Sequence, residues 1–151
     1  MNVLLVVQLV LVGLLAGEEL IVRWGVQPAL SALPDEIHVR TRIALVKSLK
    51  VAVPILIVPT VLASVAVLVI AGAGDGLGWR IAAAATLAAF LLASFLGTVP
   101  INIGVDDWDP VAPPADWKRV VARWQRIDVL RSSAAGITFV LFTIALVQFL
   151  S

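Results

Sequence analysis

Two adjacent carboxylates close the first apolar stretch of the chain. Glu18 and Glu19 follow an apolar run that begins at Val3. A carboxylate deep in lipid costs at least about 2.5–3.5 kcal/mol, and two adjacent carboxylates also repel each other. We therefore expect at least one of them to face the interior of a helix bundle and to meet a cation or a proton. Arg23, four residues after Glu19, is a favourable helical partner, so the pair is either a working site or an interfacial pair with Arg23.

The single histidine of the chain, His38, shares a helix face with Arg42, four residues further on. A histidine beside the carboxylates could move a proton near neutral pH, but a lone histidine is usually structural or solvated. One histidine with carboxylates also suits iron, manganese or zinc. A single metal ion is therefore possible, although no spacing enforces one and no cofactor is evident. Its candidate ligands are Glu18, Glu19, His38 and Asp128.

The segment before the last apolar stretch carries two distinct helix faces. One set is spaced by seven, four and three positions and should point inward; it consists of Trp117, Trp124, Asp128 and Arg131. A second set forms a basic stripe suited to anionic headgroups; it consists of Arg119, Arg123 and Arg126. The alternative for the first set is an aromatic belt at the membrane surface with an Asp128–Arg131 ion pair.

An amide and a further tryptophan follow the third apolar stretch. Asn102 can reach the same membrane depth as Glu18 and Asp128. Trp108 lies a few residues beyond it and either closes a pocket from below or anchors the chain at the interface. Both readings of Trp108 stay open.

These residues belong to a chain that is too apolar to fold as a soluble domain. Hydrophobic residues make up 61% of its 151 residues and charged residues 14%, with a mean hydropathy of +1.06. A soluble domain carries about 25% charged residues and needs polar groups to cover its surface. The net charge of +1 and the lack of basic blocks give no sign of nucleic-acid binding. The absence of cysteine excludes disulfides, thiolate metal sites and cysteine nucleophiles.

Four apolar stretches are each long enough to cross a bilayer, which takes about 20 residues. They cover residues 3–22, 51–70, 79–99 and 132–150. A backbone in lipid must satisfy its own hydrogen bonds, so these spans are helices. Trp79 and Arg80 should mark the membrane interface where the third span begins. The sequence thus predicts an all-α fold, a bundle of four transmembrane helices that forms a single domain over residues 1–151.

The connections between the spans differ in length. Residues 72–76 form a glycine-rich turn. The first long connection starts a helix at residues 34–36 that continues into the second span, where Pro54 and Pro59 should kink it. The second long connection is irregular until Asp116 caps a helix that runs into the fourth span. Both long connections therefore predict amphipathic helix extensions beyond the membrane core.

Lysine and arginine are distributed unevenly along the chain. The long connections, residues 23–50 and 100–131, hold five each, and the short turn contributes Arg80 alone. Positive residues favour cytoplasmic loops. We therefore expect a multi-pass protein of the cell membrane, in contact with lipid, with both long connections in the cytoplasm and both termini outside.

Two short motifs resemble those of the anthrone oxygenase-like family, whose members are small four-helix membrane proteins. The motifs are Thr98-Val99-Pro100-Ile101-Asn102, followed by Trp108, and Trp124-Gln125-Arg126-Ile127-Asp128-Val129-Leu130-Arg131. Many members end the third span with Val-Pro-x-Asn and carry Trp, a polar residue and Arg at the spacing of the second motif. The resemblance covers essentially the whole chain and implies an oxidative activity, since characterised members oxidise anthrones to anthraquinones. The chain differs at Asp128, where many members have His or Asn, and at residues 17–19, where many have an apolar aromatic segment.

The main hypothesis is an oxygenase-like membrane enzyme that acts on a small lipophilic or aromatic substrate at the cytoplasmic side. Glu18, Glu19 or His38 would then remove a proton, while preorganised donors stabilise a developing oxyanion. The expected donors are Asn102 and Arg131. Aromatic rings and two further cations would bind the substrate, namely Trp108, Trp117, Trp124, Arg23 and Arg42.

Two alternatives belong to other functional classes. The first is an accessory or structural subunit without chemistry, whose polar residues only anchor it at the interface. The second is a small proton-coupled transporter that works as a dimer, although the acids lie at the membrane edge and the connections are long. A homo-oligomer is possible under any of these hypotheses.

Overall fold

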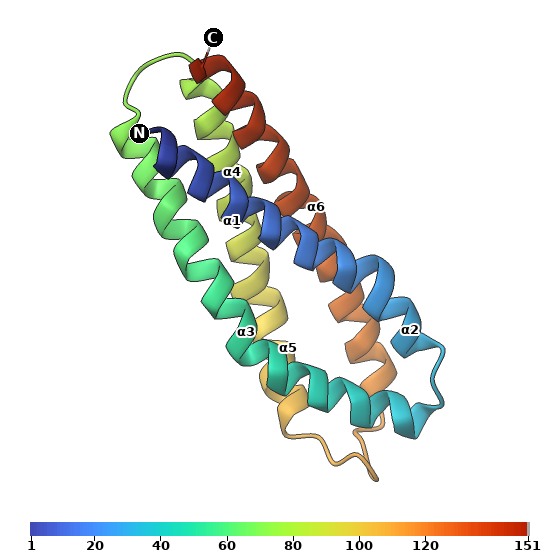
Figure 1. Cartoon of the computed structure of the whole chain (residues 1–151). Coiled ribbons are helices and arrows are strands. Elements are labelled where there is room, and N and C mark those ends of the chain that lie inside the picture. Colours follow the sequence, from blue (N-terminus) through green and yellow to red (C-terminus); the bar gives the residue numbers. More distant parts are fainter. Residues whose placement is uncertain (151) are drawn as a thin grey trace.

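The computed structural model describes residues 1–150, in which four long helical segments form an elongated bundle (Figure 1). Every regular element within these residues is a helix. Each of the four segments has the length and hydropathy that a membrane crossing requires. The predicted all-α fold of four membrane-spanning helices is therefore confirmed.

The first and third segments each contain one wide helical turn. The first segment runs through α1 (Asn2–Ile21), the π-helical η1 (Val22–Val26) and α2 (Gln27–Ser31). The third runs through α4 (Leu77–Ala93), the π-helical η2 (Ser94–Thr98) and α5 (Val99–Asp106). π-Turns of this kind are often found at functional sites.

A proline follows each π-turn and accounts for it. Pro28 and Pro100 lie within the first two positions of α2 and α5. A proline ring collides with the carbonyl group four residues earlier and has no N–H of its own. The residue before each proline therefore bonds one position further back: the backbone N–H of Gln27 donates to the carbonyl of Val22, and that of Val99 to the carbonyl of Ser94.

The second and fourth segments are single helices that extend past the membrane core. They are α3 (Asp35–Ile70), with 36 residues, and α6 (Trp117–Leu150), with 34 residues. α3 starts directly after Pro34, contains Pro54 and Pro59, and changes direction along its length (Figure 1). The predicted extensions and the kink are confirmed.

Helix α6 makes the most extensive packing in the bundle, against α4 and α1, and α1 packs in turn against α3. The apolar core between them consists of Leu15, Ala16, Leu87, Phe90, Ala134 and Ala135. Inside the bundle, the hydroxyls of Thr86 and Thr138 hydrogen bond at 2.8 Å and tie α4 to α6. Large apolar side chains on the outer faces, such as Ile55 and Leu96, are mostly exposed, so these faces contact lipid.

The glycine-rich turn joins α3 to α4 at the end of the bundle that also holds both termini (Figure 1). Gly76 has a φ of +79°, and a Cβ there would lie 2.7 Å from the carbonyl oxygen of Ala145. Trp79 is 39% exposed, as expected for an interfacial residue. Arg80 instead turns into the bundle, where it is 2% exposed and donates to the carbonyl oxygen of Gly72 at 3.1 Å. The free carbonyls of the turn attract this guanidinium inward.

Candidate functional site

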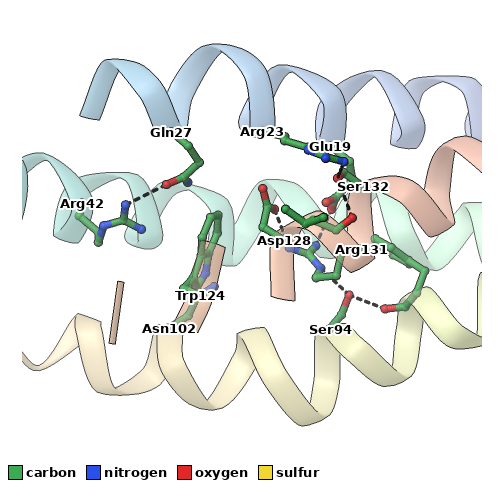
Figure 2. Close-up of polar contacts among 12 residues, drawn as sticks. Glu19, Arg23, Gln27, Arg42, Ser94, Asn102, Trp124, Asp128, Arg131 and Ser132 are labelled. Atoms are coloured by element: carbon green, nitrogen blue, oxygen red, sulfur yellow. Dashed lines mark hydrogen bonds and ion pairs between the residues drawn. The ribbon is translucent and has the colours of Figure 1, made fainter. Parts of the chain in front are cut away.

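Three ionisable side chains that are far apart in the sequence meet inside the bundle. Glu19 on α1 is 1% exposed, and Asp128 and Arg131 on α6 are 2% and 6% exposed. Figure 2 shows them facing one another between the helices. We call Glu19, Asp128 and Arg131 the buried charge group. The predicted inward face of α6 is confirmed, since Trp124 is buried on it as well and Trp117 is half-buried.

Arg131 is the hub of the buried charge group. Its Nη2 lies 2.5 Å from Glu19 Oε1, and its Nη1 lies 3.8 Å from Asp128 Oδ1. Its Nε donates to Ser94 Oγ at 2.8 Å, and the Ser94 hydroxyl donates in turn to the carbonyl of Phe90. The guanidinium carbon lies 5.2 Å from the centroid of the Phe90 ring. One cation is thus held in place by two acids, a hydroxyl and an aromatic face.

Three carboxylate oxygens around this hub are buried and receive no hydrogen bond from another residue type, although the Glu18 and Glu19 side chains can share one hydrogen bond when a proton lies between them. The three oxygens are Glu18 Oε2, Glu19 Oε2 and Asp128 Oδ1. The contact from Asp128 Oδ1 to Arg131 Nη1, at 3.8 Å, is too long for a hydrogen bond. Buried polar atoms are nearly always paired, and an unpaired one costs about 1–3 kcal/mol. These oxygens are therefore the acceptors that a proton, a water or a bound molecule would meet.

Two further arginines, Arg23 and Arg42, help to balance the negative charge of the buried acids. The guanidinium groups of Arg131, Arg23 and Arg42 all act electrostatically on Asp128. Together with Glu18 and Glu19 they make three acids and three bases, which sum to zero when every group is ionised. Opposite charges held close together offset part of the cost that each of them would carry alone inside a membrane protein.

Arg23 does not pair with Glu19 as the helical spacing predicts. Its Nη1 donates instead to the hydroxyl oxygens of Ser132 and Ser133, at 3.2 Å each. The π-turn that begins at Val22 interrupts the regular four-residue spacing between the two side chains. Glu19 consequently meets Arg131 across the bundle rather than a residue of its own helix.

His38 belongs to a second polar cluster, which is centred on Arg42. We call it the Arg42 layer, and it consists of Arg42, His38, Gln27 and Trp124. Arg42 Nε donates to His38 Nε2 at 3.2 Å, and Arg42 Nη2 donates to Gln27 Oε1 at 3.0 Å. The guanidinium carbon of Arg42 lies 5.3 Å from the Trp124 ring centroid. This layer touches the buried charge group through α6, on which Trp124 lies one turn before Asp128 (Figure 2).

The predicted metal ligands are divided between the buried charge group and the Arg42 layer. No group of three or more histidine, cysteine or acidic side chains within residues 1–150 is arranged to hold a metal ion. His38 Nε2, which would be a ligand atom, already accepts the hydrogen bond from Arg42. Glu18, Glu19 and Asp128 lie on the side of the buried charge group.

The aromatic residues and Asn102 surround the Arg42 layer. The Trp124 indole N–H donates to Asn102 Oδ1 at 3.1 Å. The rings of His38 and Trp117 meet edge to face, with 5.2 Å between their centroids. Trp108 packs with Trp117 against an apolar cluster made of Val39, Ile43, Val46 and Val105. These side chains close the end of the bundle next to the long connections.

Sequence reasoning missed three polar residues of the site. Ser94 orients Arg131, Gln27 orients Arg42, and Ser132 holds Arg23. The available sign in the sequence was that Gln27 directly precedes Pro28 and that Ser94 is a polar residue inside the apolar third span, six positions before Pro100. Polar side chains inside membrane helices usually bond across helices, and this rule could have marked them.

Comparison with known proteins identifies the family. The anthrone oxygenase family model matches residues 44–141, which is 98 of the 151 residues. The matched region includes Ser94, Asn102, Asp128 and Arg131, whereas the α1 acids lie before it. No curated protein and no solved structure matches the chain. The match covers well over half of the chain, and the chain therefore belongs to the anthrone oxygenase family.

Proposed function

We propose that this protein is an oxygenase-like membrane enzyme that oxidises a small lipophilic, aromatic substrate with molecular oxygen. Its membership of the anthrone oxygenase family supports the reaction class. The observation that carries the proposal is the buried charge group with its unpartnered carboxylate oxygens. A general base needs a carboxylate oxygen that no protein donor occupies, and Glu19 Oε2 meets this requirement.

In the proposed reaction a carboxylate removes a proton from a methylene group that lies next to an aromatic carbonyl system. Glu19 Oε2 is the favoured base, because Arg131 fixes the other oxygen of the same carboxylate at 2.5 Å. Negative charge then spreads onto the substrate oxygen. Arg131 Nη1 supports this charge, since its 3.8 Å separation from Asp128 leaves its N–H groups available to a closer acceptor.

The oxidation balances with dioxygen as the oxidant. The substrate carbanion gives its electron pair to dioxygen, a C–O bond forms, and the proton taken by the carboxylate returns to the distal oxygen to give a hydroperoxide. Loss of water then breaks the O–O bond and the second C–H bond and leaves a carbonyl group. One methylene and one O₂ thus become one carbonyl and one water, and the carboxylate ends in its starting form.

We also propose that the Arg42 layer forms the floor of the site on the cytoplasmic side. The lysine and arginine bias of the long connections supports this orientation. Trp108 and Trp117 supply half-buried aromatic rings at this end of the bundle, and the buried Trp124 ring packs against Arg42. Asn102 and Arg42 supply polar groups between them.

The test uses anthrone as the probe and protein purified into phosphatidylcholine vesicles. Oxygen uptake and anthraquinone absorbance are recorded together, and the background of protein-free vesicles is subtracted. We expect the protein to accelerate both signals with one O₂ consumed per anthraquinone. Glu19→Gln should lower kcat by about 10²–10⁴-fold, the usual contribution of a general base.

Glu36→Gln is the matched control, because Glu36 forms an exposed ion pair with Arg40 at 3.2 Å. This variant should keep the wild-type rate. The proposal fails if the wild-type protein is no faster than empty vesicles, or if Glu18→Gln, Glu19→Gln and Asp128→Asn all retain full activity. The first of those outcomes would favour an accessory subunit without chemistry.

A further inference from the structure

A small cavity lies where all four membrane helices meet, towards the end of the bundle that holds both termini (Figure 1). Its volume is about 10 Å³, which is room for one water molecule or one monatomic ion and too little for a phosphate or carboxylate group. Much of its wall consists of buried apolar side chains from α1, α3 and α6, among them Leu5, Val67, Phe142 and Ala145. The polar part of the wall comes from α1 and α4.

Two polar side chains line the cavity, Gln8 on α1 and Arg80 on α4, and each is 2% exposed. Arg80 bonds the carbonyls of the α3–α4 turn through a single nitrogen, Nη2, and the nearest carbonyl oxygen is that of Gly72 at 3.1 Å. Its Nε and Nη1 and the Nε2 of Gln8 are buried and have no hydrogen-bond partner within residues 1–150. Buried N–H groups are nearly always paired, so these three nitrogens indicate that an acceptor belongs in the cavity.

Arg80 carries its charge into the bundle without forming an ion pair with any acid in the described part of the chain. The nearest acid along the sequence, Asp75, is exposed and meets Arg80 through its backbone carbonyl oxygen, at 3.4 Å. The arginines that act on the acids of the candidate site are Arg23, Arg42 and Arg131. A lone cation inside a membrane protein is costly, so a counterion would stabilise Arg80.

The number and the charge of the donors favour an anion over a water molecule. A water molecule accepts two hydrogen bonds and has two of its own to donate, whereas the unpartnered buried atoms here are three N–H donors. A halide accepts from all three and also neutralises the guanidinium, and such charge-assisted bonds are about twice as strong as neutral ones. The volume excludes polyatomic anions such as sulfate or a lipid phosphate. Chloride, an abundant monatomic anion, fits these requirements.

We infer that this cavity binds one chloride ion, held by the Arg80 guanidinium and the Gln8 amide N–H. The ion joins α4 to α1 and neutralises the arginine that bonds the α3–α4 turn, so it stabilises this end of the bundle. The cavity shares no residue with the buried charge group. Chloride binding is therefore independent of the proposed reaction, and a chain without oxygenase activity would still bind the ion.

Chloride binding is measured on protein in micelles of dodecylmaltoside, a neutral detergent. Sodium chloride replaces sodium gluconate at constant ionic strength, because gluconate is too large for the cavity. At about ten times its Kd, chloride should raise the midpoint of thermal unfolding by about 3–6 °C, and the rise should saturate. Broadening of the chloride NMR signal by the protein reports the same binding directly. Bromide should substitute for chloride in both measurements, and sulfate should not.

Two variants remove the donors separately. Arg80→Gln should abolish the chloride-dependent rise, because it removes the charge and both unpartnered guanidinium nitrogens. Arg126→Gln is the matched control, since Arg126 is an exposed arginine of α6 that does not line the cavity, and it should keep the full rise. Gln8→Met leaves the Arg80 bonds to the turn in place and keeps an unbranched side chain of similar length, but it removes Nε2. It should weaken chloride binding roughly 10-fold, the effect of losing one hydrogen bond to a charged group.

Wild-type protein whose unfolding midpoint and chloride NMR signal do not respond to chloride would overturn the inference and assign the cavity to a buried water molecule. A full chloride response in Arg80→Gln would overturn it equally. If Arg80→Gln does not fold, Gln8→Met decides, and wild-type affinity in that variant contradicts the chloride site. Competition by sulfate or by phosphatidylglycerol would show a site open to phosphate groups, which contradicts a closed cavity for a monatomic ion.

Discussion

Replacement of Arg131 by methionine should destabilise the protein strongly, and a second replacement, Glu19→Gln, should recover part of the loss. Arg131 is the cation between two buried acids, at 2.5 Å from Glu19 and 3.8 Å from Asp128. Methionine is unbranched and apolar and reaches about as far as the Nε of arginine, so it fills the inner part of the Arg131 site but removes the charge and the guanidinium contact with Phe90. The double variant then isolates the coupling between Glu19 and Arg131 from these other losses.

The expected magnitude follows from the burial of the group. Two unit charges 4 Å apart attract by about 4 kcal/mol at an effective dielectric constant of 20. Removal of one partner from a buried pair leaves the other charge uncompensated and costs about 3–5 kcal/mol. We expect this loss in the free energy of unfolding for Arg131→Met. In the double variant the Glu19 charge is gone as well, so the two changes should show a coupling energy of about 1–3 kcal/mol.

The measurement is a double-mutant cycle on the free energy of unfolding in mixed micelles, by steric trapping or by titration with sodium dodecyl sulfate. The control cycle uses the exposed Glu36–Arg40 pair, whose coupling should stay below about 0.5 kcal/mol. The reasoning is refuted if the Glu19 and Arg131 changes are additive. A cost below about 1 kcal/mol for Arg131→Met would refute it equally, since that is less than the loss of one buried hydrogen bond to a charged group.

Three further predictions concern the fold and its orientation. Gly76→Ala should cost more than about 1 kcal/mol of unfolding free energy, because its φ is positive and its Cβ would meet a carbonyl oxygen of α6, whereas Gly74→Ala should be near neutral; equal effects would contradict this. Trp124→Phe removes the indole N–H donor of a 3.1 Å bond and should cost about 1 kcal/mol in the same assay. The chain has no cysteine, so single cysteines report its topology without background. We expect a membrane-impermeant thiol reagent to label Asp75→Cys on intact cells and Asp109→Cys only after permeabilisation, and the opposite pattern would reverse the proposed orientation.

Properties that depend on composition and on unbroken helical periodicity were predictable from the sequence. The four spans, the bend of the proline-containing α3 and the helix start after residue 34 follow from hydropathy and proline positions. The inward face of α6 was predictable because a regular helix runs from Trp117 through Arg131. Spacings of seven, four and three positions keep their meaning over that distance.

Periodicity failed where the helix changes type. The expected Glu19–Arg23 pair spans the start of η1, and the π-turn changes the number of residues per turn at that point. Pro28 was the one feature of the sequence that could have indicated this π-turn, and Pro100 plays the same part for η2. Where a proline lies inside a long apolar stretch, residues on either side of the preceding turn do not keep the face that regular helical spacing assigns to them.

For a different reason, spacing along a single helix could not predict which side chains pair with each other in the candidate site. Arg131 meets Glu19, which is 112 positions away in the sequence, and Ser94, which is 37 positions away. Such pairs depend on how α1, α4 and α6 pack against one another, and spacing along one helix carries no information about that packing. The sequence could predict that buried acids need cations, but it could not predict which cation each acid would find.

The separation between Glu19 and Arg131 also has a consequence for biogenesis. Chains are made from the N-terminus, so α1 enters the membrane with its two acids long before Arg131 leaves the ribosome. Until the last helix inserts, Glu19 lacks the cation that pairs with it in the folded protein, so it must stay hydrated at the bilayer surface or hold a proton. A chain interrupted before α6 would keep this defect permanently, and that exposed polarity would mark it as unfinished to the proteases that remove incomplete membrane proteins.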